Sequence, residues 1–169
     1  MPCDSANHFR LTQFASELLN ETMSILFLET ARNLRATIER AKSGNAGIKW
    51  LPRFPENCCN FAANLLLLEL SEAGGERLRR MLGTVHDDRG DDLATHVWVQ
   101  AGDLVVDIAA DQFEQPKVIV EHLSSWHNSL HDVKPFLPKR DLAEGVSEAE
   151  IARLRGVYEE VLRELAPFR

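Results

Sequence analysis

Apolar residues recur at the three- and four-residue spacing of an α-helix over the first part of the chain. This pattern contains neither proline nor glycine and predicts one long helix or two shorter helices between Leu11 and Lys42. The residues SGNAG at 43–47 end the pattern, and Pro52 and Pro55 keep the next segment extended or turning. The apolar positions of the first segment are Leu11, Phe14, Leu18, Leu19, Ile25, Leu26, Leu28, Leu34 and Ile38.

A second helical segment is apolar on most of its faces. The sequence CNFAANLLLLELSEA, from Cys59 to Ala73, is rich in helix formers and is followed by two glycines that favour a helix end. A helix that is apolar nearly all round is expected to be buried. Near the end of the chain, Ser147 and Glu150 form a capping-box pattern that predicts a helix running to about Leu165.

Between these helices the pattern changes to short, β-branched apolar runs that are typical of strands. Thr95–Val99 and Leu104–Ile108 flank the turn sequence QAGD, which predicts a β-hairpin, and a further short strand is expected at Lys117–Val120. The polar segment 86–92 and the segment 123–140, which has no clear period, are expected to be loops. Helices followed by a small antiparallel sheet and a final helix predict an α+β fold.

The composition is that of one globular domain. The chain has 169 residues, of which 44% are apolar and 27% charged, and this length can bury a core without disulfides or a structural metal. We expect a single domain over 1–169, with a helical N-terminal part at 1–48, a catalytic core at 49–122 and a C-terminal helix at 147–166. The three cysteines, Cys3, Cys58 and Cys59, do not form an even disulfide framework.

Charge and hydropathy narrow the range of partners and locations. The formal net charge of −7 has the wrong sign for a domain that neutralises phosphates, so no nucleic-acid partner is expected. The longest apolar runs, such as Leu65–Leu68, are too short to span a bilayer, so no membrane segment is expected. The first ten residues do not resemble an export signal, which favours a cytoplasmic protein, or an effector delivered by a non-classical route.

Three residues suited to thiol chemistry stand where the expected elements would bring them together. Cys59 lies at the expected start of the buried helix, where free backbone N–H groups and the helix dipole favour a thiolate and can stabilise an oxyanion. His96 and Asp107 lie on the two strands of the expected hairpin. The imidazole can take the thiol proton and later return one to a leaving group, while the carboxylate fixes the ring tautomer.

The length of the hairpin loop decides whether His96 and Asp107 can meet. A two-residue loop at Gly102-Asp103 pairs Ala101 with Leu104 and places Asp107 diagonally beside His96. A loop shifted one residue earlier pairs His96 with Asp107 directly, whereas a three-residue loop sends the two side chains to opposite faces of the sheet. The proposed chemistry therefore predicts a two-residue loop.

The segments FPENCCNFAA at 54–63, THVW at 95–98 and LVVDI at 104–108 resemble the papain-like and transglutaminase-like cysteine enzymes. Those enzymes, which have arylamine N-acetyltransferase relatives, place Cys, His and Asp or Asn in this chain order. The resemblance covers about 50–120, and its most specific part is His96 followed two positions later by tryptophan and then by an apolar strand ending in aspartate. It implies a papain-like or transglutaminase-like fold, with the nucleophile helix packed on a small antiparallel sheet.

By resemblance, Cys59 is the nucleophile, His96 the base and Asp107 the orienting residue. The doubled cysteine leaves Cys58 as an alternative, and Cys59 is preferred because it is nearer the helix start and is followed by polar and small residues. No upstream glutamine matches the oxyanion residue of papain-like proteases. Asn57 is a substitute, backbone N–H groups are another, and the remaining candidates for substrate or oxyanion contacts are Cys58, Trp98 and Gln112.

The expected function is cysteine-dependent acyl transfer without a cofactor, most simply hydrolysis or deamidation of an amide or peptide bond through a thioester. The substrate would be a protein, a peptide or a small amide. Transglutaminase-like and N-acyltransferase activities remain open, as does a non-catalytic binding module in which these residues belong to the core. The oligomeric state is not predicted.

No metal site is expected. His127 and His131 are four residues apart, which would place both on one face of a helix, but the surrounding sequence has little helical support and no nearby glutamate in a zinc-enzyme pattern. The acidic segment 87–92 lacks the alternating oxygen ligands of an EF-hand loop.

Overall fold

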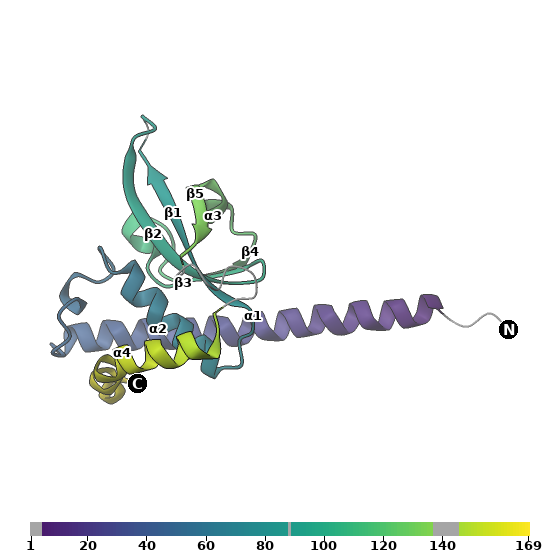
Figure 1. The fold of residues 1–169 in the computed structure, drawn as a ribbon, viewed down its shortest axis with the longest axis horizontal. Helices are drawn as coiled ribbons and strands as arrows, with labels where there is room; N and C mark the ends of the chain where they lie inside the picture. Colours follow the sequence, from purple (N-terminus) through teal and green to yellow (C-terminus); the bar gives the residue numbers. More distant parts are fainter. Residues whose placement is uncertain (1–4, 88, 137–145) are drawn as a thin grey trace.

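The computed structural model describes residues 5–87, 89–136 and 146–169. The first apolar pattern forms one continuous helix, α1 (Ser5–Ser43), rather than two. Its C-terminal half is buried against the rest of the protein, whereas its N-terminal part extends beyond the other elements (Figure 1). Among the described side chains of α1, the large apolar ones that are exposed are Phe14, Leu18, Leu19 and Ile25.

Helix α2 (Cys59–Glu72) lies at the centre of the protein, as its apolar sequence predicts. The short 3-10 helix η1 (Leu51–Arg53) leads toward it, and α2 packs on the sheet and against α1 and α4. All of its leucines are buried, because apolar neighbours surround it on nearly every side. The hydrophobic core consists of buried residues of α1, α2, the sheet and α4.

Helix α4 (Glu148–Leu165) begins where the capping-box pattern predicts, but the box is one-sided. Ser147 is the N-cap, and its hydroxyl accepts the backbone N–H of Glu150 at 3.3 Å. The Glu150 carboxylate does not accept the backbone N–H of Ser147, which would be the second bond of a capping box. It accepts hydrogen bonds from Arg153 and from the buried Arg80, because an unpaired buried guanidinium would be costly. A short 3-10 helix, η3 (Ala166–Phe168), ends the chain.

The sheet has five antiparallel strands in the order β4-β3-β2-β1-β5, so the fold is α+β (Figure 1). The predicted hairpin and third strand are present, with β2 longer than expected and β4 two residues later. The strands are β1 (Leu78–His86), β2 (Asp92–Ala101), β3 (Leu104–Asp107), β4 (Ile119–His122) and β5 (His131–Pro135).

Strand β1 was not expected, and the loop expected at 123–140 is wrong. The loop expected at 86–92 connects β1 to β2, although its end residues, His86 and Asp92, belong to these strands. The segment 123–140 contains helix α3 (Ser125–Ser129) and β5, while its residues 137–140 lie outside the described part of the chain. In β1 the buried Arg80 replaces an apolar residue, which obscures the strand pattern.

The hairpin between β2 and β3 has the two-residue loop that the proposed chemistry requires. Ala101 pairs with Leu104, and Gly102 supplies the positive φ of 63° that such a loop favours. Both faces of the sheet are covered: Val97 packs in the core with α2, whereas Trp98 packs in a second cluster with Trp126 of α3. His96 follows the alternation of Trp98, so it points toward the α3 face.

Candidate functional site

Cys59 is the first residue of α2 and is partly exposed. Its Sγ lies 4.0 Å from the carbonyl oxygen of Thr95, and His96 and the backbone N–H groups of Asn60 and Val97 contribute hydrogen bonds that stabilise its ionised form. Burial raises the pKa of the Cys59 thiol, but these hydrogen bonds and the charge on His96 outweigh burial and lower it. The Cys59 thiol is therefore more readily ionised than a free thiol.

Cys58 has the opposite environment. It is fully buried, and its Sγ lies 3.4 Å from the carbonyl oxygen of Trp50 and 3.2 Å from that of Glu56. Burial raises the pKa of the Cys58 thiol. The side chain faces the core rather than His96, so Cys58 can neither attack nor contact a substrate in this structure.

His96 and Asp107 meet as the hairpin register predicts. His96 Nε2 donates to Asp107 Oδ2 at 2.6 Å, and both side chains are buried. The other carboxylate oxygen, Oδ1, accepts the backbone N–H of Ala109 at 2.8 Å. The Nε2 proton is thus directed at the carboxylate, which leaves Nδ1 of the ring for Cys59.

The electrostatics of this pair favour an imidazolium beside a carboxylate. Burial alone lowers the pKa of His96, but the charge and hydrogen bond of Asp107, together with Cys59, raise it to about 9. Burial raises the pKa of Asp107, but the charge of His96 and the hydrogen bonds from His127 and His96 hold it well below its usual range. A thiolate at Cys59 and an imidazolium at His96 therefore stabilise each other.

His127 is a site residue that the sequence interpretation missed. It lies on α3, is 2% exposed, and donates from Nε2 to the same oxygen of Asp107, Oδ2, at 3.1 Å. Its other ring nitrogen, Nδ1, lies 2.9 Å from the hydroxyl of Ser124. Only the spacing to His131 drew attention to it, and that spacing has no role here, since His131 is on β5 and stacks on His86.

The atoms of His96, Asp107 and His127 are close enough together to be considered as metal ligands. However, two ligands of one tetrahedral zinc ion lie about 3.3 Å apart, given metal–ligand bonds of about 2.0 Å. The 2.6 Å between His96 Nε2 and Asp107 Oδ2 is instead the length of a charge-assisted hydrogen bond. The cluster fits a shared proton better than an ion.

Gln112, on the 3-10 helix η2 (Ala110–Phe113), connects three parts of the site. Its Oε1 accepts the backbone N–H of Asn57 at 3.3 Å, and its Nε2 donates to the carbonyl oxygen of Ala109 at 2.9 Å. The same Nε2 lies 3.4 Å from His96 Nδ1. Gln112 therefore borders the His96 ring, while the backbone N–H of Asn57 is already bonded to Gln112.

Trp98 does not contact a substrate, because only 2% of it is exposed. Its ring lies nearly parallel to that of His96, with a centroid distance of 6.0 Å, and packs against it in the interior. Phe113 and Trp126, which are half-buried, approach the His96 ring at 5.3 and 5.4 Å. These aromatic rings limit the access of water to the histidine.

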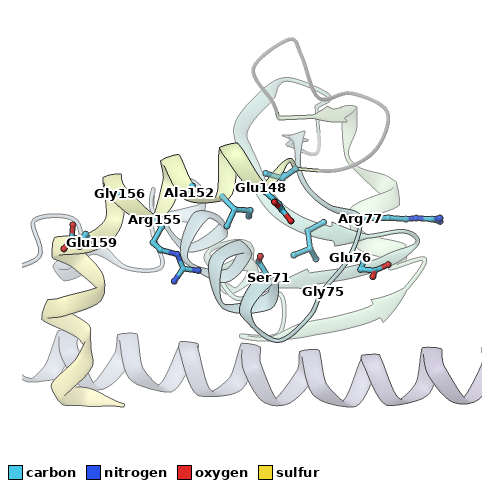
Figure 2. Close-up of a pocket in the computed structure, with 12 residues that line it drawn as sticks. Ser71, Gly75, Glu76, Arg77, Glu148, Ala152, Arg155, Gly156 and Glu159 are labelled. Carbon is cyan, nitrogen blue, oxygen red and sulfur yellow. The ribbon is translucent and has the colours of Figure 1, made fainter.

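A cavity of about 760 Å³ lies elsewhere, between the end of α2, the start of β1 and α4 (Figure 2). Its lining carries both signs of charge, including Glu148, Glu159 and Arg155, and Arg155 pairs with Glu72. Cys59, His96, Asp107 and His127 are not among the described residues that line it. The cavity is therefore separate from the thiol site.

Comparisons with known proteins add no relative. No protein-family model matches this sequence, and neither a curated protein nor a solved structure does. Within the described ranges, no helix combines the length and the apolar composition needed to cross a bilayer.

Proposed function

We propose that this protein is a cysteine acyl-transfer enzyme that hydrolyses or deamidates an amide or peptide bond through a thioester. The observation that supports this most is the order of the three side chains: His96 acts on the Cys59 thiol, which lies at the first residue of a helix, and His96 Nε2 donates to Asp107 at 2.6 Å. We also propose that the fold is papain-like or transglutaminase-like, since α2 carries the cysteine and packs on the strands β1 and β2.

In the first half-reaction, the Cys59 thiolate attacks the carbonyl carbon of the substrate. The negative charge that develops on the carbonyl oxygen would be stabilised by the first N–H groups of α2, which have no intrahelical carbonyl partner, and by Gln112 Nε2, which lies 3.4 Å from His96 Nδ1. The C–N bond then breaks, and His96 Nδ1 gives its proton to the leaving amine or ammonia. The product is a thioester on Cys59.

In the second half-reaction, water attacks the thioester carbonyl. His96 Nδ1 takes a proton from this water, the bond from carbon to Sγ breaks, and Cys59 leaves as a thiolate. The acid product departs, which restores the thiolate and imidazolium. Asp107 keeps the Nε2–H tautomer of His96 throughout, so that Nδ1 always faces the reacting atoms.

The proposal is tested with p-nitrophenyl acetate. This activated ester can acylate a reactive thiol because its nitrophenolate group leaves readily. We expect a burst of nitrophenolate and an acetyl group on the peptide that contains Cys59, detected by mass spectrometry. Cys59→Ala should abolish the burst, and the matched variant Cys58→Ala should retain it.

A non-catalytic binding module would give a different result. The burst would be absent, and iodoacetamide would alkylate Cys59 at about pH 6 no faster than it alkylates a free thiol. That pair of results would contradict the proposed function.

A further inference from the structure

Two histidines compete for one oxygen atom of Asp107. Oδ2 accepts His96 Nε2 at 2.6 Å and His127 Nε2 at 3.1 Å, while Oδ1 is occupied by the N–H of Ala109. The orienting function of the carboxylate needs only the first of these bonds. The second one therefore calls for a separate explanation.

The proton on His127 is placed by its neighbours. A carboxylate can only accept, so Nε2 of His127 carries hydrogen, and the hydroxyl of Ser124 can donate to Nδ1 of the same ring. Ser124 is itself 3% exposed, so water does not compete for this bond. His127 thus directs an N–H dipole at Asp107 without needing a charge of its own.

We propose that His127 is a positioning residue. Its hydrogen bond reduces the negative charge that Asp107 presents to His96, so that the His96 imidazolium can still release its proton. Each donor on Oδ2 reduces the negative charge that the other donor experiences. An imidazolium that faced the whole charge of a buried carboxylate would hold its proton too firmly to give it to a leaving amine. The catalytic meaning of this role rests on the proposed function, but the effect on the His96 proton does not.

The titration of His96 depends on the titratable groups that surround its ring. Among the described residues, the titratable groups that face its ring are Cys59 from α2, Asp107 from β3 and His127 from α3. Replacing Cys59 by serine removes the thiol that titrates together with His96. In that background, a change in the titration of His96 reports on the two groups that remain.

Two amide variants separate hydrogen bonding from packing. His127 also packs on Trp98 at 4.8 Å and on Trp126 at 4.6 Å, so a bulky replacement alone would not distinguish the two roles. In His127→Gln, the amide nitrogen can reach the position of Nε2 and still donate to Asp107. In His127→Asn, the shorter amide can meet Ser124 but falls short of Oδ2.

The measurement is an NMR titration of the histidine ring protons in Cys59→Ser, alone and combined with each His127 variant. The His96 signal is the one that disappears in His96→Gln. We expect His127→Asn to raise the midpoint of the His96 titration by roughly half a unit to one unit, because one hydrogen bond to an ionised group is lost. His127→Gln should restore the original midpoint. His122→Gln, which alters the exposed pair with Asp103, is the control and should leave it unchanged.

An unchanged or lowered midpoint in His127→Asn would overturn the inference. Loss of the fold in both His127→Asn and His127→Gln would make His127 a packing residue and would overturn the inference as well. If the midpoint rises as expected while the protein is not acylated by p-nitrophenyl acetate, the proposed function fails and the role of His127 stands. If the protein is acylated and the midpoint does not move, the reverse holds.

Discussion

Arg35 binds Asp111 through two parallel hydrogen bonds of 2.8 Å across 76 residues of chain. The same guanidinium donates to the carbonyl oxygen of Ile108 at 2.7 Å and lies 4.5 Å above the ring of Phe54. Ile108 follows Asp107, Asp111 precedes Gln112, and Phe54 belongs to the loop that leads to Cys59. One residue of α1 therefore connects the segments that carry the site.

We expect Arg35→Lys to lower the free energy of unfolding by about 2–4 kcal/mol. An ammonium cannot form the two parallel bonds, and a largely buried carboxylate is left incompletely paired. Urea denaturation measures this loss, and alkylation of Cys59 in the folded variant shows whether the site is also displaced. Lys117→Ala removes only an exposed ion pair with Glu39 and should cost at most about 1 kcal/mol. Equal losses in the two variants would contradict the central position of Arg35.

The two adjacent cysteines should respond oppositely to replacement by alanine. Cys59→Ala removes one sulfur at a partly exposed position, so stability should change by less than about 1 kcal/mol while acylation is lost. Cys58→Ala empties part of the core and should cost about 1–2 kcal/mol while acylation persists. Thermal denaturation and the ester assay measure the two effects. A large destabilisation by Cys59→Ala, in a parent protein without activity, would favour the binding module.

The chemistry of the site depends on its residues as a unit, and a double variant tests this. Without His96 the thiol stays mostly protonated at neutral pH, so His96→Ala should reduce acylation nearly as much as Cys59→Ala. The double variant should be no worse than Cys59→Ala alone. Asp107→Asn should cost roughly a hundredfold or more, because it offers the ring the wrong tautomer partner. Additive losses in the double variant would show that the two residues act independently.

Sequence patterns located the parts of the site that lie on strongly patterned elements. The long apolar run after Cys59 defines a buried helix, and the glycine in the QAGD turn favours the two-residue loop that brings Asp107 to His96. These features depend on residues that are close together in the sequence. They could therefore be recognised without knowledge of the tertiary structure.

The elements that the sequence did not reveal depend on distant partners. Arg80 is acceptable inside β1 only because Asn64 of α2 and Glu150 of α4 accept its hydrogen bonds. Helix α3 has five residues, too few for a helical period, and His127 acquires its role only from contact with a carboxylate on another element. Charged or polar residues in the core thus concealed both strand β1 and the second histidine.

The stability of Cys59→Ser should fall as the pH rises above neutrality. The pKa of His96 is raised from 6.5 to about 9 in the folded protein. Burial lowers this pKa, but the charge and hydrogen bond of Asp107, together with Cys59, raise it by more. Protonated His96 therefore adds stability that is complete below about pH 6.5 and is lost as the pH rises through the folded pKa. We expect a loss of about 2 kcal/mol, since the serine variant lacks the share of the shift that Cys59 provides.

The serine background is needed because the wild-type thiol acts in the opposite sense. The pKa of Cys59 is lowered on folding, so its thiolate adds stability that is present at high pH and lost as the pH falls. Urea denaturation at a series of pH values measures the slope, and Cys59→Ser combined with His96→Gln should be flatter over this range. Equal slopes in the two variants would show that His96 does not hold its proton in the folded protein.

Gln112→Ala should slow acylation by p-nitrophenyl acetate by roughly ten- to a hundredfold, while iodoacetamide alkylates Cys59 at nearly the original rate. Alkylation requires a thiolate but forms no oxyanion, whereas acylation requires both. The Gln112 amide lies next to His96 Nδ1 and accepts the N–H of Asn57 just before α2. Its loss should therefore affect stabilisation of the oxyanion more than formation of the thiolate. Gln115→Ala is the matched control, because within the described residues the Gln115 side chain donates to the carbonyl oxygen of Phe113 and not to the site. Equal reductions of both rates would mean that Gln112 acts through the thiolate, and the absence of any reduction would remove it from the site.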